Sequence, residues 1–76
     1  MKRSKNNLRV LQVLNDAELL LSPTEITGRV FGEVNVSTRT MTSQTIRRLM
    51  NESLIAESER HLFEITDKGI SYLNTL

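Results

Sequence analysis

The spacing of the apolar residues changes twice along the chain, and this order constrains the fold more than any other feature of the sequence. Within residues 6–16, 23–31 and 40–53, the apolar residues have the three- or four-residue spacing of one face of a helix. Phe63 and Ile65 then alternate around Glu64, as in a strand, and helical spacing returns after Thr66. We therefore predict a mainly α fold with one small β-hairpin.

The chain is short enough that one hydrophobic core must stabilise it. Of its 76 residues, 38% are hydrophobic and 25% are charged, and none is a cysteine. Disulfides and thiolate metal sites are therefore excluded, and a deep catalytic cleft is not expected in a chain of this length. We predict a single domain over residues 1–76, in which the basic residues 1–5 form a mobile tail.

The first and last helices are predicted from their apolar faces. A helix over residues 6–16 has a face formed by Leu8, Val10, Leu11, Val13, Leu14 and Asn15. A final helix of about ten residues is capped by Thr66 and Asp67. Its apolar residues are Ile70, Tyr72, Leu73 and Leu76. These residues can close the core or contact a second subunit, and we favour an arrangement in which they do both.

The second helix has the strongest start signal of the chain. Ser22 can cap it, Pro23 fits its first position, where no amide donor is needed, and Glu25 can complete a capping box. The helix is predicted over residues 23–31, and Gly32 is a plausible stop. The residues expected to be buried are Ile26, Val30 and Phe31.

The third helix carries the clearest amphipathic stripe. With about 100° per residue, the residues within about 60° of Ile46 are Thr42, Leu49, Met50 and Ser53, and we expect this stripe to be buried. The opposite side carries Gln44, Arg48 and Asn51, whereas Ser43 and Arg47 lie on one flank. Arg48 is therefore expected to point outward and Arg47 sideways.

Arg39 limits where this helix can begin. In the same register it lies near the centre of the buried stripe, which is costly for an unpaired charge. The helix is therefore predicted over about residues 40–53, with Thr40 or Thr42 as its cap and residues 32–39 as an extended turn. Ser37 is the other candidate cap if the register shifts.

Residues 55–65 are predicted to form the hairpin. Residues 55–58 make the outgoing strand, residues 59–61 the tip and residues 62–65 the return strand. His61 at the tip is expected to be exposed and not to be a metal ligand or a catalyst.

The net charge is only +1, but the charged residues are unevenly distributed. Seven of the ten basic residues fall in residues 1–15 and 34–51, and neither segment contains an acid. The resulting local positive field suits a polyanion better than a membrane. The nine acids are scattered without a partner base or nucleophile, so an enzyme is not expected.

The ordered combination of these motifs resembles a known family. Residues 21–26 have the sequence LSPTEI, residues 46–55 contain Ile46, Leu49 and the tripeptide SLI, and residues 62–69 have the sequence LFEITDKG. Together they resemble the helix-two entry, recognition helix and wing of MarR-type and PadR-type bacterial and archaeal regulators. The resemblance covers residues 8–76. It implies a winged helix-turn-helix with a three-helix core, a wing and a C-terminal helix.

The resemblance implies binding of double-stranded DNA, with the third helix in the major groove. Ser43 and Gln44 occupy the place of the family's contact pair, and Gln44 could bond bidentately to adenine. The full set of expected DNA-binding residues is Arg39, Thr40, Thr42, Ser43, Gln44, Arg47, Arg48 and Arg60. Arg48 is the favoured base contact, and Arg47 the favoured phosphate contact.

The sequence departs from the family in three places. The turn before the third helix is longer than usual, and the short wing has Arg60 as its only assured cation. Ser53 stands where the family commonly has glycine, at a corner that favours a left-handed conformation.

We expect a transcription regulator, more specifically a repressor, that binds DNA as a homodimer without metal or cofactor. The basic and then apolar start resembles a secretion signal, but Arg9, Gln12 and Asn15 interrupt it and no small-residue cleavage site follows. No apolar run approaches the ~20 residues of a membrane span, so we expect a cytoplasmic protein. The alternative is a winged-helix module that binds a partner protein and not DNA.

Overall fold

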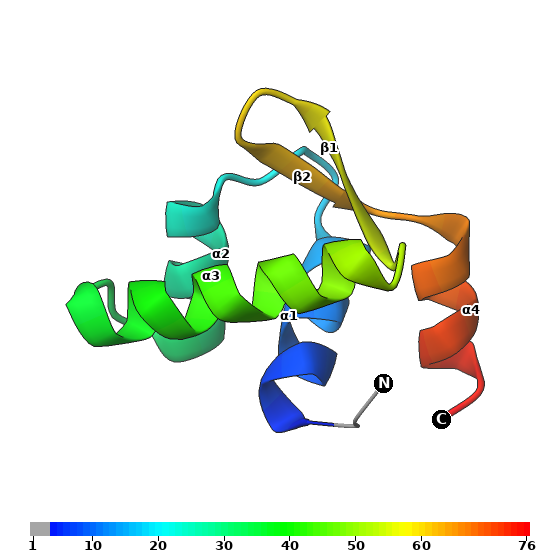
Figure 1. The fold of residues 1–76 in the computed structure, drawn as a ribbon, viewed down its shortest axis with the longest axis horizontal. Helices are drawn as coiled ribbons and strands as arrows, with labels where there is room; N and C mark the ends of the chain where they lie inside the picture. The colour runs from blue at the N-terminus through cyan, green and yellow to red at the C-terminus, as the bar shows by residue number, and fades with distance from the viewer. Residues whose placement is uncertain (1–3) are drawn as a thin grey trace.

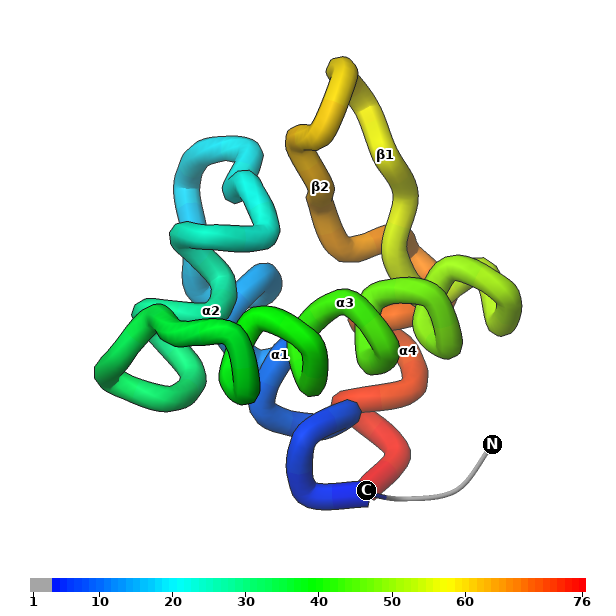
Figure 2. Tube along the Cα trace, turned by 60° about the vertical axis from the view of Figure 1, so that its left-hand side comes forward, coloured from blue at the N-terminus to red at the C-terminus, as the bar shows by residue number. Residues whose placement is uncertain are grey.

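The computed structural model describes residues 4–76, which form four helices and one two-stranded antiparallel sheet (Figure 1). The elements in chain order are α1 (Lys5–Asp16), α2 (Pro23–Phe31), α3 (Val36–Asn51), β1 (Ile55–Glu59), β2 (Leu62–Ile65) and α4 (Asp67–Asn74). The predicted mainly α class with one β-hairpin is confirmed. The hairpin lies on one side of α3, and α1 crosses behind it (Figures 1 and 2).

α1 and α2 begin and end close to the predicted residues, because local signals define their ends. Ser4 Oγ accepts the amide of Asn7 at 3.1 Å and caps α1. At α2, Ser22 and Glu25 form the predicted capping box, with reciprocal bonds of 3.2 and 3.1 Å. Gly32 ends α2 in the left-handed conformation, at φ 76°.

The predicted basic tail over residues 1–5 needs a correction at its end. Ser4 is the cap of α1, and Lys5 is its first residue. The helix dipole does not favour a cation at this end, but the serine cap and the apolar face of α1 stabilise the helix. Residues 1–3 lie outside the part of the chain that the structure describes.

The start of α3 differs from the predicted one. The helix begins at Val36, with Asn35 as its N-cap. Asn35 Oδ1 accepts the Thr38 amide at 2.9 Å, and Thr38 Oγ1 accepts the Asn35 amide at 2.9 Å. This reciprocal pair fixes the helix end in the way a capping box does, with threonine in place of the usual Glu or Gln.

The extended turn predicted over residues 32–39 is therefore wrong, and so are the caps predicted at Ser37, Thr40 or Thr42. Only residues 32–35 connect α2 to α3. The connection is short, contrary to the expectation of a long turn.

The core lies between α1, α2, α3 and the hairpin. Its buried hydrophobic residues are Val10, Leu11, Leu14, Leu21, Ile26, Ile46, Leu49, Leu54, Ile55 and Phe63. Several residues predicted to be buried lie at its edge or outside it: Leu8, Val13, Val30 and Phe31 are half-buried, whereas Asn15 and Ser53 are exposed. Asn7 of α1 and Thr27 of α2 are buried instead, because the apolar face of each helix is rotated from the predicted one.

The hairpin is tied to the rest of the fold by a third extended segment. Ile55 pairs with Ile65 and Glu57 with Phe63 in an antiparallel register, which is irregular between Glu57 and Glu59. On the edge of β2 that faces away from β1, Phe63 exchanges two backbone hydrogen bonds with Leu21, at 2.9 and 3.1 Å. The segment before α2 therefore holds β2 in place.

A tight joint connects α3, the hairpin and α4. Ser53 adopts the left-handed conformation expected at this corner, with φ 61°. Thr66 Oγ1 donates to the Ser53 carbonyl at 2.7 Å, and the Thr66 amide donates to the Leu54 carbonyl at 3.0 Å. Gly69 packs so closely on Leu54 that an added Cβ would overlap the Leu54 carbonyl oxygen. The joint fixes how the hairpin leaves α3.

α4 is capped by Thr66, as predicted, but has eight residues, fewer than the ten or so expected. Tyr72 and Leu73 are half-buried and pack against the core, whereas Ile70 and Leu76 are exposed. Of the helices described over residues 4–76, none has the length and apolar character needed to cross a membrane.

Candidate nucleic-acid interface

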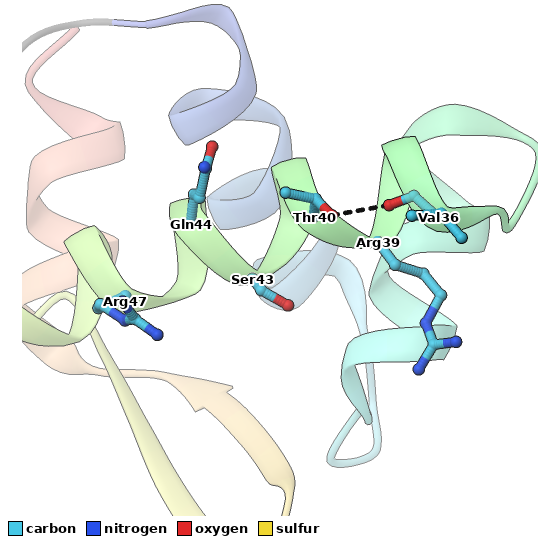
Figure 3. A pocket seen from close by; sticks show the side chains of 6 residues that line it. All are labelled: Val36, Arg39, Thr40, Ser43, Gln44 and Arg47. Atoms are coloured by element: carbon cyan, nitrogen blue, oxygen red, sulfur yellow. Dashed lines mark hydrogen bonds between the residues drawn. The ribbon is translucent and has the colours of Figure 1, made fainter.

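One face of α3 presents an exposed row of side chains that are polar or basic except for one valine. We call this row the α3 stripe; it consists of Val36, Arg39, Thr40, Ser43, Gln44 and Arg47, which line one surface pocket (Figure 3). They form two adjacent rows in which each residue is four positions from the next, 36–40–44 and 39–43–47, so they share one side of the helix. All six residues are exposed. The stripe is therefore available to a partner along most of α3.

The stripe faces outward because threonines share the opposite side with the apolar residues. The buried residues of α3 are Thr38, Thr42, Thr45, Ile46 and Leu49. The hydroxyl of Thr42 donates to the Thr38 carbonyl at 3.0 Å, and that of Thr45 donates to the Met41 carbonyl at 2.9 Å. These hydrogen bonds let polar side chains lie in the core without a large desolvation cost.

Burial of the threonines explains why the predicted orientation of α3 is inaccurate. Counting about 100° per residue, the buried side is centred roughly 60° away from the predicted position. Arg39, which the prediction places near the centre of the buried stripe, is exposed on the helix. Met50, which was expected to be buried, remains 39% exposed.

The structure changes the roles available to two predicted DNA-binding threonines. Thr42 is fully buried and its hydroxyl is bonded within α3, so it cannot touch a ligand directly. Thr40 lies in the α3 stripe as expected of a contact residue. Its hydroxyl donates to the Val36 carbonyl at 2.8 Å, and its methyl group is left to face outward (Figure 3).

The two adjacent arginines differ, but in the opposite sense to the prediction. Arg48 Nη2 donates to Asn7 Oδ1 at 3.3 Å and to Thr45 Oγ1 at 3.2 Å. Asn7 is buried in α1, so Arg48 reaches across the contact between α1 and α3. Arg48 is exposed, as predicted, but its guanidinium is bonded at the contact between α1 and α3, because the rotation of α3 brings Arg48 toward α1.

Arg47 occupies the position that was expected for Arg48. It lines the pocket of the α3 stripe and also a neighbouring pocket between α3, Pro23 and Phe63. Ser43 lines the same two pockets. Arg47 and Ser43 therefore lie where the face of α3 meets the base of the hairpin.

The α3 stripe is electrically positive along its length. Among residues 4–76, Arg39 and Arg47 form no ion pair and no side-chain hydrogen bond. Residues 34–51 contain no acid that could neutralise them. Two guanidinium groups with all their donors available make this face suited to phosphate or to the acceptor edges of bases.

Arg60 is separated from the other predicted site residues and lies in an acidic region. It occupies the turn between β1 and β2, where His61 adopts the left-handed conformation with φ 61°. The His61 amide donates to Glu57 Oε2 at 2.7 Å. Residues 52–67 contain five acids and Arg60 as their only Lys or Arg. The hairpin is thus negative where α3 is positive.

Val36 is the site residue that the sequence prediction missed. The prediction placed it in a turn, so its position on the outer face of a helix was not considered. The spacing of Asn35 and Thr38 was the available signal, because an N-cap residue and a hydrogen-bonding residue three positions later mark a helix start.

The chain matches no protein-family model, no curated protein and no solved structure. Within residues 4–76, no three His, Cys, Asp or Glu side chains are grouped so that they could hold a metal ion. The interpretation of the α3 stripe therefore depends on its geometry and charge.

Proposed function

We propose that the chain is a winged helix-turn-helix module that binds duplex DNA through the α3 stripe. The single observation that carries the proposal is an exposed face of a 16-residue helix with two unpaired arginines, Ser43 and Gln44, and no nearby acid in its sequence. The short connection between α2 and α3 supports it, since helix-turn-helix motifs join their helices by three or four residues.

The length of the stripe fits the dimensions of DNA. From Val36 to Arg47 it extends about 17 Å along the helix axis, at 1.5 Å per residue. This is about half of a 34 Å turn of B-DNA, and the major groove is wide enough to admit one α-helix. A helix docked there would present the stripe to about five base pairs.

The side chains of the stripe have distinct roles in this proposal. Gln44 bonds bidentately to the N6 and N7 edge of an adenine. Arg47, at the C-terminal end of the stripe, contacts a guanine or a phosphate, and Arg39 contacts a phosphate. Arg48 supports the interface indirectly, because it holds α3 against Asn7 of α1.

We also propose that the module acts as a homodimeric repressor. A dimer presents two α3 helices to a two-fold operator, and linking two weak contacts increases the overall affinity. Occlusion of a promoter requires no surface beyond the DNA-binding one. Analytical ultracentrifugation of the free chain and of its DNA complex measures the number of protomers, and a single protomer on a palindromic site would contradict this part of the proposal.

The proposal is tested by fluorescence anisotropy of labelled mixed-sequence duplex at several salt concentrations. The full chain should bind, and its affinity should decrease steeply with salt as counterions are released. The double variant Arg39→Gln, Arg47→Gln should bind more weakly, with a salt slope lower by about 2, at roughly 0.9 per lost phosphate contact. The matched control, Lys68→Gln, removes one charge from α4 and should leave both values nearly unchanged.

The acidic hairpin favours a second candidate function, a module that docks a partner protein carrying a basic surface. Five acids in residues 52–67 are a charge pattern that attracts cations and repels phosphates. Absence of duplex binding even at low salt would overturn the DNA proposal and favour this second function. Binding that survives the double substitution would show that another surface contacts the DNA.

A further inference from the structure

Val36 is an exposed apolar side chain in an otherwise polar and basic stripe. Its side chain is 83% exposed, more than any other large hydrophobic residue among residues 4–76. It is the first residue of α3, beyond the end of the core, and its side chain lies on the outer surface beside Arg39 and Thr40 (Figure 3). Packing within the chain therefore does not explain a valine at this position.

Thr40 enlarges the apolar area next to Val36. Because the Thr40 hydroxyl donates to the Val36 carbonyl, its methyl group is the part that remains toward the outside. The methyl groups of the two β-branched residues thus form a small apolar spot at the N-terminal end of the α3 stripe. Arg39 lies next to this spot and provides the cation.

The major groove contains one matching apolar group on a base edge. Thymine carries a C5 methyl there, whereas the other groups on the base edges are hydrogen-bond donors and acceptors. The N-terminal residues of a helix-turn-helix recognition helix are those that meet base edges. We propose that Val36, supported by Thr40, contacts the 5-methyl group of a pyrimidine and makes the chain select thymine at one position of each half-site.

This inference depends on the proposed function and adds the base edge that α3 prefers. Val36 and Gln44 are eight residues apart, which is about 12 Å along the helix axis. At 3.4 Å per base pair, the methyl group and the adenine bound by Gln44 belong to base pairs about three or four steps apart. The selected thymine is therefore distinct from the partner of that adenine.

The test begins with selection of bound duplexes from a random pool of unmodified DNA by the full chain. Each thymine of the selected site is then replaced by deoxyuridine, which removes only the methyl group. When the thymines are replaced one at a time, the contacted thymine of either half-site should weaken binding by the wild-type chain about fourfold, the value of one buried methyl group. In this pool the methyl group can come only from thymine. The thymine whose replacement weakens binding is also replaced by 5-methylcytosine, with guanine opposite. This substitution tests whether the methyl group alone is sufficient to maintain the affinity.

Variants of Val36 identify the residue that contacts the methyl group. Val36→Ser should lower affinity for the thymine site and lose the response to deoxyuridine, whereas Val36→Thr, which keeps one methyl group, should retain part of it. Leu19→Ser makes a similar exposed apolar-to-polar change outside α3 and should retain the full response. Thermal melts establish that each variant is folded.

Two results would overturn the inference while leaving DNA binding intact. In one, the wild-type chain binds duplex DNA, but either no sequence is enriched from the random pool or no deoxyuridine replacement changes its affinity. In the other, Val36→Ser retains the full response. Failure of the wild-type chain to bind any duplex at low salt would instead overturn the proposed function, and the inference with it.

Discussion

α3 and the β1–β2 hairpin are neighbours in the fold and carry opposite charge. Residues 34–51 contain three arginines and no acid, whereas the hairpin, residues 55–65, contains three acids and one arginine and is flanked by Glu52 and Asp67. The two regions are joined at Ser53 and Leu54, so the sign of the side-chain charge changes within a few residues along the chain.

The difference explains how a chain with a net charge of +1 can have a positively charged face on α3. Clustered charges set the local field, and the net charge only averages them. It also changes the role expected for Arg60, because the acids around the hairpin oppose approach to a phosphate backbone. We infer that α3 supplies most of the DNA contact and that the hairpin supplies little.

The strongest test of this difference in charge replaces one serine in each region by glutamate. Ser43→Glu places it in the α3 stripe and should weaken duplex binding by roughly 100-fold, since a buried carboxylate facing phosphates is repelled and desolvated. Ser58→Glu places it on the exposed part of β1 and should change binding by less than about threefold. Anisotropy titrations at one low salt concentration measure both. Equal losses would show that the hairpin is also at the interface.

The joint between the two regions is tested by a substitution that should lower the free energy of unfolding by about 2 kcal/mol. Gly69→Ala pushes a methyl group into the Leu54 carbonyl, and overpacking of this kind costs about 1–3 kcal/mol. Gly28→Ala is the control, because the nearest atom to its added Cβ is Val34 Cγ2 at 3.8 Å. Gly28→Ala should be neutral or stabilising by up to about 1 kcal/mol. Urea unfolding measures both, and an unaffected Gly69→Ala would show that the joint is loosely packed.

Neutralising the acids of the hairpin should have a smaller effect on binding. Glu59→Gln combined with Glu64→Gln removes negative charge from the hairpin, outside the proposed contact. Duplex affinity should rise about threefold at low salt and remain nearly unchanged at 0.15 M, where the Debye length is about 8 Å. A larger gain that persists in salt would place the hairpin against the DNA. Glu57 is left intact because it accepts the His61 amide.

The smallest expected effect concerns Ser53, at the boundary between the regions. Its φ of 61° is unfavourable for a residue with a Cβ, and Ser53→Gly relieves this strain while making the unfolded chain more flexible. We expect a net stabilisation of about 0.5 kcal/mol, or a rise in Tm of roughly 2–4 °C. The contact from Thr66 is to the Ser53 backbone carbonyl and should persist. A lower Tm would show that the serine side chain contributes to the corner.

The elements defined by local signals could be predicted from the sequence. The capping box of Ser22 and Glu25 and the left-handed Gly32 were predicted from residues a few positions apart, and the structure confirms them. The order of helices and strands also followed from the spacing of apolar residues. These features depend on short-range hydrogen bonds and periodicity, which the sequence displays directly.

The orientation of α3 could not be predicted in the same way. The prediction relied on apolar residues, but Thr38, Thr42 and Thr45 share the buried side, with their hydroxyls bonded to the backbone or the cap. The hydrogen bond of Arg48 to Asn7 joins residues 41 positions apart, and no local pattern indicates it. As a result, the proposal gives Arg47 the base contact that was predicted for Arg48, and gives Arg48 a structural role at the contact between α1 and α3.

The most direct test of the central claim compares these two adjacent arginines in binding and stability. Arg47→Ala should lower duplex affinity about tenfold or more, reduce the salt slope by about 0.9 and leave the free energy of unfolding unchanged. Arg48→Ala should leave affinity within about threefold and cost roughly 1 kcal/mol of stability, because it removes two hydrogen bonds between Arg48 and its neighbours. A larger loss of affinity in Arg48→Ala than in Arg47→Ala, or no loss in either variant, would contradict DNA binding through the α3 stripe.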